Sequence, residues 1–156
     1  MRGRTIPPLP NNLCGNLGLQ AVQSIDANKT KDIGFDDLVC LVGEPIDKTI
    51  QDCSEVFSRE DGGESIIIDP ALRTNEIIIS GDTNVLWFSD WSKFGFYDAD
   101  FGWGNPIWAS AGSMFADNIV VLMGNKEGDG IEAMVHLEQN YMPYFEQDEE
   151  IKSFCS

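Results

Sequence analysis

The chain has 156 residues, of which 42% are hydrophobic and 10% aromatic, and this size and composition predict a single globular domain over residues 1–156. Its 26 acidic residues outnumber its 10 basic residues and give a formal net charge of −16 at pH 7. Because this charge repels nucleic acid and anionic membrane surfaces, we expect neither to be a partner.

The cysteine and histidine content argues against a bound metal. The chain has 4 cysteines without a Cys-x-x-Cys pair and only 1 histidine, so it cannot make an ordinary zinc site. Reduced thiols in the cytoplasm fit this pattern best. No run approaches the roughly 18 apolar residues of a membrane span, and no apolar signal-peptide core follows the first arginines, so we expect neither membrane insertion nor secretion.

The first residues are rich in proline. Residues 2–10 are predicted to be extended, because proline fixes φ and restricts the residue before it. Residues 4–10 also fit the Arg-x-x-Pro-x-x-Pro form of an SH3-domain ligand, which leaves open the alternative of a binding module. Residues 16–25 alternate loosely between apolar and polar side chains and predict a strand.

A long helix is predicted next. From Asp32 or Gly34 to Phe57, apolar residues recur at spacings of three and four. Pro45 interrupts this pattern, so either a kinked helix or two abutting helices should result. Residues 65–69 and 76–80 are short apolar runs rich in isoleucine, and both predict buried strands.

The clearest hairpin lies near the C-terminus. Residues 118–124 and 130–137 are apolar runs that a loop of turn-forming residues joins. The alternation in the second run predicts that Ile131 faces the core and that His136 points away from it. Residues 138–154 predict an acidic final helix in two parts, broken near Pro143. Together these elements predict an α/β fold, with a mixed sheet flanked by helices.

An aromatic segment, residues 88–108, precedes the hairpin. Phe94, Phe96 and Tyr97 suggest a half-buried strand that enters a sharp turn at Gly102 and Gly104. The plainest interpretation is an aromatic turn that closes a core. A kinase-type Asp-Phe-Gly site is unsupported, since the other kinase motifs are absent, and a calcium loop fails because Ala109 stands where a bidentate Glu belongs.

Asp100 ends the predicted strand with a carboxylate that needs a partner, either an arginine or a ring of backbone N–H groups. Residues 100–104 read Asp-Phe-Gly-Trp-Gly and resemble the signature of the plant BAHD acyltransferases. Residues 89–93 resemble the Thr/Ser-Ser-Trp segment that precedes this signature. Residues 4–10, followed by Gly15-Asn16, are similar to an interior strand and loop of the family.

The C-terminal region extends the resemblance. Residues 128–133 and 145–150 resemble the tail of alkaloid-acetylating members of the family. The resemblance implies transfer of an acyl group, here acetyl, from acyl-CoA as co-substrate to a small-molecule alcohol. It also implies that the chain corresponds to one domain, the C-terminal one, of a two-domain CoA-dependent acyltransferase fold.

The resemblance implies roles for particular residues. Ser89 and Trp91 would line the acceptor side of the reaction centre, with the indole N–H near the oxyanion. Asp100 would be structural and would hold an arginine, for which Arg4 and Arg2 are the candidates and Arg4 is the one we favour. Two aromatic residues and two glycines complete the structural motif, namely Phe101, Gly102, Trp103 and Gly104.

The family's general base is expected to be missing. In that family it is a histidine in a His-x-x-x-Asp motif, whereas His136 has Asn140 at the fourth place after it. We therefore expect the chain to be the C-terminal half of a family member, truncated and inactive alone. An uncovered domain face should then favour self-association. The alternative is a non-catalytic partner or decoy, or a protein that binds through its proline motif.

Overall fold

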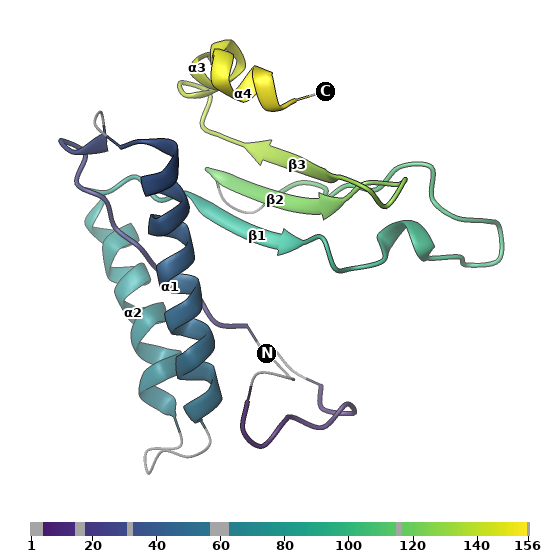
Figure 1. Cartoon of the computed structure of the whole chain (residues 1–156), viewed down its shortest axis with the longest axis horizontal. Coiled ribbons are helices and arrows are strands. Elements are labelled where there is room, and N and C mark those ends of the chain that lie inside the picture. Colours follow the sequence, from purple (N-terminus) through teal and green to yellow (C-terminus); the bar gives the residue numbers. More distant parts are fainter. Residues whose placement is uncertain (1–4, 15–17, 31–32, 57–62, 115–116, 156) are drawn as a thin grey trace. The chain divides into compact units, whose positions relative to one another are not determined.

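The structure is a computed structural model that describes residues 5–14, 18–30, 33–56, 63–114 and 117–155. The chain divides into two compact units, Met1–Thr83 and Asn84–Ser156, and each unit is described by itself. Besides a 3₁₀ helix, Phe96–Asp98, the elements drawn in Figure 1 are α1 (Phe35–Glu55), α2 (Glu64–Ser80), β1 (Trp87–Trp91), β2 (Ile119–Gly124), β3 (Ile131–His136), α3 (Met142–Gln147) and α4 (Glu149–Phe154).

Helix α1 of the first unit forms where the apolar periodicity predicts a helix. Two aspartates in its first turn place negative charge at the helix N-terminus, and the Asp37 carboxylate accepts a hydrogen bond from the Gly34 N–H at 3.2 Å. Pro45 lies inside the helix, where the Thr49 hydroxyl donates to the Pro45 carbonyl at 2.8 Å. The predicted helix is therefore confirmed as one element that contains the proline.

Helix α2 occupies the residues for which the sequence predicts two strands, so that prediction is wrong. A short apolar run can form either a buried strand or part of a helix, and the pattern alone does not distinguish the two. Left-handed glycines bracket α2, Gly63 at φ 73 and Gly81 at φ 69. A side chain at position 63 would come within 2.6 Å of the Val56 carbonyl oxygen, so glycine is required between α1 and α2.

The two strands expected nearer the N-terminus do not form in the described residues. Residues 5–14 and 18–25 contain no strand. A strand needs a neighbour for its backbone hydrogen bonds, and a loose alternation does not bury enough apolar surface to hold one. Val22 and Ile25 accordingly stay 42% and 44% exposed. The first four residues and residues 15–17 lie outside the described part of the chain.

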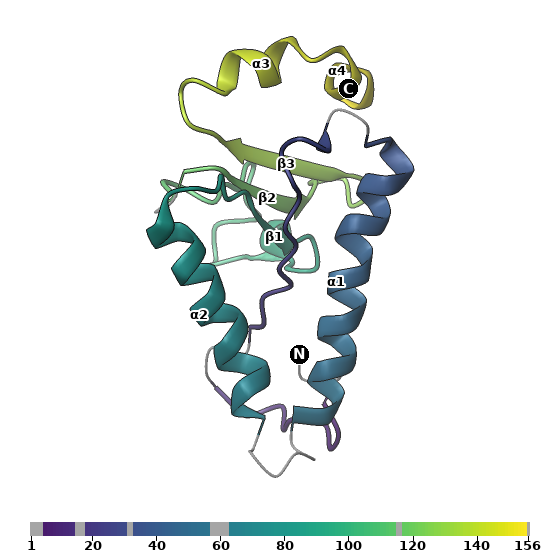
Figure 2. The same ribbon diagram turned by 90° about the vertical axis from the view of Figure 1, so that its left-hand side faces the viewer.

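The second unit contains a three-stranded mixed sheet in the order β1-β2-β3. Strand β1 runs parallel to β2, and β2 runs antiparallel to β3. Figures 1 and 2 both show α3 and α4 beyond the β3 edge of this sheet. The predicted hairpin and the predicted fold class, α/β with a mixed sheet, are therefore confirmed.

The prediction of which β3 side chains face the core is wrong. Val121 and Met123 of β2 are 0% and 1% exposed, and they stand opposite Met134 and Glu132 of β3. Directly paired residues share a face of the sheet, so Met134 faces the buried cluster, whereas Ile131 is 60% exposed. The alternating pattern of β3 shows which side chains share a face, but it does not show which face is buried. A distant segment, residues 96–114, covers the face that carries Met134.

The aromatic segment also departs from the prediction, because its strand ends earlier. Strand β1 stops at Trp91, where the Asp90 carboxylate accepts a hydrogen bond from the Ser92 N–H at 2.8 Å and starts a turn. The Phe94 N–H then donates to the Trp91 carbonyl at 2.9 Å. Phe96 and Tyr97 consequently lie in a 3₁₀ helix and not in the expected strand.

The C-terminal residues form two short helices, as predicted, but the break lies elsewhere. Pro143 stands in the first turn of α3, a position that tolerates proline because its missing N–H has no helical partner there. The break is at Asp148, whose carboxylate caps α4 by accepting from the Ile151 N–H at 3.0 Å. Among the described residues, no helix is both long and apolar enough to span a membrane.

Candidate functional site

Ser89 and Trp91 lie two residues apart on β1 and therefore on one face of the sheet. The strand pairing sets Ser89 opposite Val121 and Trp91 opposite Met123. The indole Nε1–H of Trp91 donates a hydrogen bond to Ser89 Oγ at 2.8 Å. The structure thus brings together the two residues that the family resemblance places on the acceptor side, and it pairs them with each other.

This face is covered by the segment that links β1 to β2. The Phe96 ring lies 6.0 Å from the Trp91 ring, tilted by 48°. The partly buried apolar residues that pack against Ile119, Val121 and Met123 are Trp87, Trp91, Phe96, Ala109, Ala111, Met114 and Met134. Since these residues come from β1, β3 and the linking segment, the face holds the core of the second unit.

Tyr97 ties the linking segment to β3. Its hydroxyl donates to Glu132 Oε2 at 3.4 Å and accepts from the Ala109 N–H at 3.4 Å. The Ala111 N–H donates to the Met134 sulfur at 3.2 Å, a second tether between the same two parts. Sequence reasoning treated Tyr97 as a strand residue and missed this role, since hydrogen bonds over such long sequence separations leave no local pattern.

Asp100 organises the loop that follows. Its Oδ1 accepts hydrogen bonds from the N–H groups of Gly102 at 2.7 Å and Gly104 at 3.0 Å. These N–H groups, that of Gly102 first, hold the pKa of the Asp100 carboxyl below its ordinary value of 3.8. Of the two partners that the sequence suggests, backbone N–H groups are therefore present. Arg4 lies outside the described residues, so its pairing with Asp100 stays a prediction.

The aromatic residues after Asp100 do not close a core. Phe101 and Trp103 stack on each other, with ring centroids 5.8 Å apart, yet they are 74% and 83% exposed. Ile107 and Trp108 are 87% and 71% exposed. We call Phe101, Trp103, Ile107 and Trp108 the aromatic loop. Gly102 and Gly104 adopt φ values of 105 and 100, which L side chains rarely adopt, and this explains the two glycines.

His136 is not placed to act on the Ser89–Trp91 pair. It stands opposite Ile119 and is half-buried on the same face as Met134, so the prediction that it points away from the core is wrong. Strands about 4.8 Å apart and residues about 3.4 Å apart along a strand put it about 12 Å from Ser89. A general base must lie within hydrogen-bond reach of the proton that it removes.

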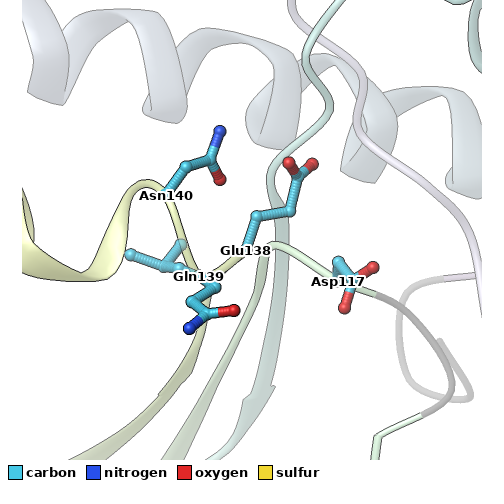
Figure 3. A pocket seen from close by; sticks show the side chains of 5 residues that line it. Asp117, Glu138, Gln139 and Asn140 are labelled. Carbon is cyan, nitrogen blue, oxygen red and sulfur yellow. The ribbon is translucent and has the colours of Figure 1, made fainter.

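A polar pocket opens where β2 begins and β3 ends, and Figure 3 shows side chains that line it. It has a volume of about 550 Å³ and is lined by Asp117, Leu137, Glu138, Gln139 and Asn140. Beside it, Asn118 Nδ2 donates to Glu138 Oε1 at 3.1 Å, and Asn118 Oδ1 accepts from the Glu138 N–H at 3.0 Å. Asn118 has a φ of 57, which asparagine tolerates better than most residues. These two hydrogen bonds join the start of β2 to the end of β3, and no sequence motif predicts them.

Nothing in the described part of the chain gathers three or more histidine, cysteine, aspartate or glutamate side chains as a metal site would need. Four cysteines are free, and among them only Cys53 is buried. The chemical groups brought together on the sheet face are therefore a hydroxyl, an indole N–H and a phenol, which can donate and accept hydrogen bonds but do not form a nucleophile–base pair.

Known proteins share both the sequence and the fold of this chain. The sequence model described as the Transferase family matches residues 1–152. The crystal structure of vinorine synthase superposes on 97% of this chain and 33% of its own, with a TM-score of 0.66 and 27% identity. The chain therefore belongs to the Transferase family, the BAHD acyltransferases, and the resemblance seen in residues 100–104 is confirmed.

Three relatives illustrate the match. A pelargonidin 3-O-(6-caffeoylglucoside) 5-O-(6-O-malonylglucoside) 4'''-malonyltransferase of Salvia splendens is 41% identical over 100% of this chain and 37% of its own length. Vinorine synthase of Rauvolfia serpentina is 31% identical over 91% and 30%. Deacetylvindoline O-acetyltransferase of Catharanthus roseus is 43% identical over 48% and 18%. The chain spans about a third of the length of the first of these relatives. The last two are of the alkaloid-related kind that the C-terminal tail resembles.

Proposed function

We propose that the chain is the part of an acyl-CoA-dependent O-acyltransferase that carries the Ser89–Trp91 pair, and that the enzyme moves a short acyl group to a hydroxyl of a small plant metabolite. The observation that carries the proposal is the family match over residues 1–152. The relatives include both a malonyltransferase and an acetyltransferase. Of these we favour acetyl, on the similarity of residues 145–150 to alkaloid-acetylating members. We place the enzyme in the cytoplasm, where free thiols persist.

We further propose that the 156 residues do not turn over substrate by themselves. Their single histidine lies about 12 Å from Ser89 by strand spacing and lacks the Asp of a His-x-x-x-Asp motif. General acid–base catalysis contributes about 10²- to 10⁴-fold of rate, so its loss would leave little measurable transfer. The comparisons give no support to the alternative of a non-catalytic partner or a proline-motif ligand.

The aromatic loop supports a proposal about assembly. Four large apolar side chains that are 71–87% exposed are costly to leave in water. Backbone hydrogen bonds to Asp100 fix the loop from which they project. We propose that this loop packs against another polypeptide surface, and that in its absence two copies of the chain associate through it.

A chimaeric enzyme tests the proposed activity. The chain is joined in place of the matching segment of the Salvia splendens malonyltransferase, the relative with which it shares 41% identity over its full length. We expect the chimaera to transfer malonyl from malonyl-CoA to the acceptor in that relative's name, with product measured by mass spectrometry. The 156 residues alone should give none. A chimaera that is folded by circular dichroism but transfers no acyl group would contradict the proposal.

A further inference from the structure

The loop between β2 and β3 contains a pair of residues that can react with each other. Residues 129 and 130 are Asp-Gly and both are exposed. In such a pair the glycine nitrogen can attack the side-chain carbon of the aspartate, because glycine has no Cβ to hinder the approach. A Cβ at position 130 would come within 3.0 Å of Asn125 Nδ2, so a larger residue would push against that amide. The loop therefore keeps a glycine beside Asp129.

The Asn125 side chain holds both partners of this reaction. Its Oδ1 accepts hydrogen bonds from the Asp129 N–H at 3.0 Å and from the Gly130 N–H at 2.9 Å. Its Nδ2 donates to Asp129 Oδ1 at 2.9 Å. The backbone closes the same loop, since the Asn125 N–H donates to the Gly130 carbonyl at 3.0 Å. One half-buried side chain thus binds the nitrogen that would attack and the carboxylate that it would attack.

These hydrogen bonds oppose the reaction. The attack requires the Gly130 nitrogen to lose its proton and to turn toward Asp129 Cγ, whereas in the folded loop this N–H is directed at Asn125 Oδ1. The carboxylate must also leave Asn125 Nδ2. Both bonds have to break before the nitrogen and the carbon can meet, and each broken bond lowers the population of the reactive conformation.

We propose that Asp129 is a site of isoaspartate formation whose rate the Asn125 side chain limits, and that the modified loop is a substrate for a methyltransferase that acts on the carboxyl group of isoaspartate. This inference is independent of the proposed acyl transfer, since it concerns the β2–β3 loop alone. Residues 126–130 are all exposed, so such an enzyme could reach the modified residue without separating the strands.

The isomerisation consumes no reagent and needs only water. The Gly130 nitrogen bonds to Asp129 Cγ, and its proton leaves with the carboxyl hydroxyl as water, which closes a succinimide ring. Water then opens the ring at either carbonyl carbon. Breaking the bond from the nitrogen to Cγ restores aspartate. Breaking the bond from the nitrogen to the main-chain carbonyl carbon of Asp129 gives isoaspartate, in which the main chain runs through Cγ and is longer by a methylene group.

The longer main chain should prevent the loop from closing again. One oxygen, Asn125 Oδ1, accepts from two consecutive N–H groups, and an added methylene moves these groups apart. The loop adjoins the pairing of Gly124 with Ile131. We therefore expect chains with isoaspartate at residue 129 to unfold at a lower urea concentration than unmodified chains.

Ageing of the 156-residue chain at neutral pH tests the proposal. Tandem mass spectrometry of peptides locates the isoaspartate, which is necessary because residues 61–62 are also Asp-Gly. We expect isoaspartate to form at residue 129 about ten- to hundredfold more slowly in the folded chain than in concentrated urea, because two hydrogen bonds must break first. Asn125→Ala should raise the folded rate about tenfold and leave the rate in urea unchanged. Lys126→Ala, in the same loop, is the matched control and should change neither rate.

Three results would overturn the role of Asn125. Equal rates in the folded chain and in urea would show that the loop protects nothing, and this comparison needs no variant. A folded rate in Asn125→Ala no higher than in the unchanged chain would show that the side chain does not limit the reaction. If Tyr97→Phe, which loosens the same unit elsewhere, raised the rate as much, general unfolding and not Asn125 would set it.

The second part of the proposal has its own test. The aged chain is incubated with an isoaspartyl methyltransferase and S-adenosylmethionine that carries a labelled methyl group. We expect the label on the peptide that contains residue 129, and none on that peptide in the Asp129→Ser variant, which cannot form the succinimide. Aged chain that contains isoaspartate at residue 129 but takes up no methyl group there would refute this part.

Discussion

The Asp100 carboxylate shows how one side chain can hold a loop that contains two glycines. Gly102 and Gly104 adopt positive φ values, and free glycines lose much conformational entropy when they are fixed in that way. By accepting from both of their N–H groups, a single oxygen offsets part of this loss. The loop is therefore ordered by its own residues, whether or not Arg4 also contacts the carboxylate.

The order of this loop should depend on pH. The folded pKa of Asp100 is below the ordinary value of 3.8, so the ionised form stabilises the loop. That stabilisation is fully present above 3.8 and is lost as the pH falls through the lowered pKa. We expect the Gly102 amide resonance and the Asp100 carboxyl carbon to titrate together in NMR spectra, with a midpoint below 3.8. The Asp100→Asn variant should abolish the titration of Gly102, and a midpoint at or above 3.8 would refute the interpretation.

Tyr97 provides a second residue-level prediction. Replacement of Tyr97 by Phe removes the hydroxyl that accepts from the Ala109 N–H and donates to Glu132. We expect the free energy of unfolding to fall by about 1 kcal/mol and the Ala109 amide to exchange faster with solvent. Tyr144→Phe is the matched control, because Tyr144 is 78% exposed. Equal changes in the two variants in urea titrations would mean that the Tyr97 hydroxyl tethers nothing.

At the scale of elements, α1 and α2 each contain a proline in their interior, Pro45 and Pro70. An interior proline cannot donate to the carbonyl four residues earlier, and its ring pushes against that carbonyl. In each helix a threonine hydroxyl four residues later donates to the proline's own carbonyl at 2.8 Å. This hydrogen bond does not replace the one that the proline cannot donate. Each proline therefore destabilises its helix, and a substitution could remove the effect.

Replacing Pro45 by alanine should therefore stabilise the first unit. The change restores an N–H that can donate to the Leu41 carbonyl and is expected to raise the free energy of unfolding by about 2 kcal/mol, after allowance for the greater freedom of the unfolded chain. Far-ultraviolet circular dichroism during urea denaturation measures the gain. Pro8→Ala, at an exposed position outside the helices, is the control. A loss of stability would show that the helix is built around the proline ring.

The elements that the sequence predicts correctly are those with strong local signals. The period of apolar residues predicts α1, and the turn-forming loop 125–130 predicts the β2–β3 hairpin. The errors come where the local pattern is ambiguous or where distant residues decide. Residues 65–69 and 76–80 lie in one helix between Gly63 and Gly81, because a short apolar run does not distinguish a strand from a helix. Strand β3 turns Met134 inward because residues 96–114 cover that face.

Part of the candidate site is likewise predictable from the sequence, and part is not. Ser89, Trp91 and residues 100–104 are found from the sequence because they match a family signature. The hydrogen bond between Ser89 and Trp91 is not predicted by the sequence, since it forms only where β1 and the packing against the Phe96 ring place the two side chains. The hydrogen bonds between Asn118 and Glu138 join residues 20 apart in the chain, and no sequence motif predicts them.

For the whole molecule, exposed aromatic surface and charge oppose each other. The aromatic loop favours association, whereas a net charge of −16 makes two copies repel. The range of that repulsion is set by salt, because the Debye length falls from about 10 Å at 0.1 M to about 3 Å at 1 M. Apolar association does not weaken over this range, so the balance should shift toward association as salt is added.

We therefore expect the 156-residue chain to be mainly monomeric at low salt and to form dimers or larger species at 1 M NaCl, as measured by sedimentation velocity. The double variant Trp103→Ser and Trp108→Ser should remain monomeric at both concentrations, because it removes the two largest side chains of the aromatic loop. Tyr144→Ser, which removes an exposed ring from α3, should behave like the unchanged chain. Since salt screens charge and leaves apolar contacts intact, association that weakens as salt rises would identify ionic contacts, and not the aromatic loop, as the surface that holds the copies together.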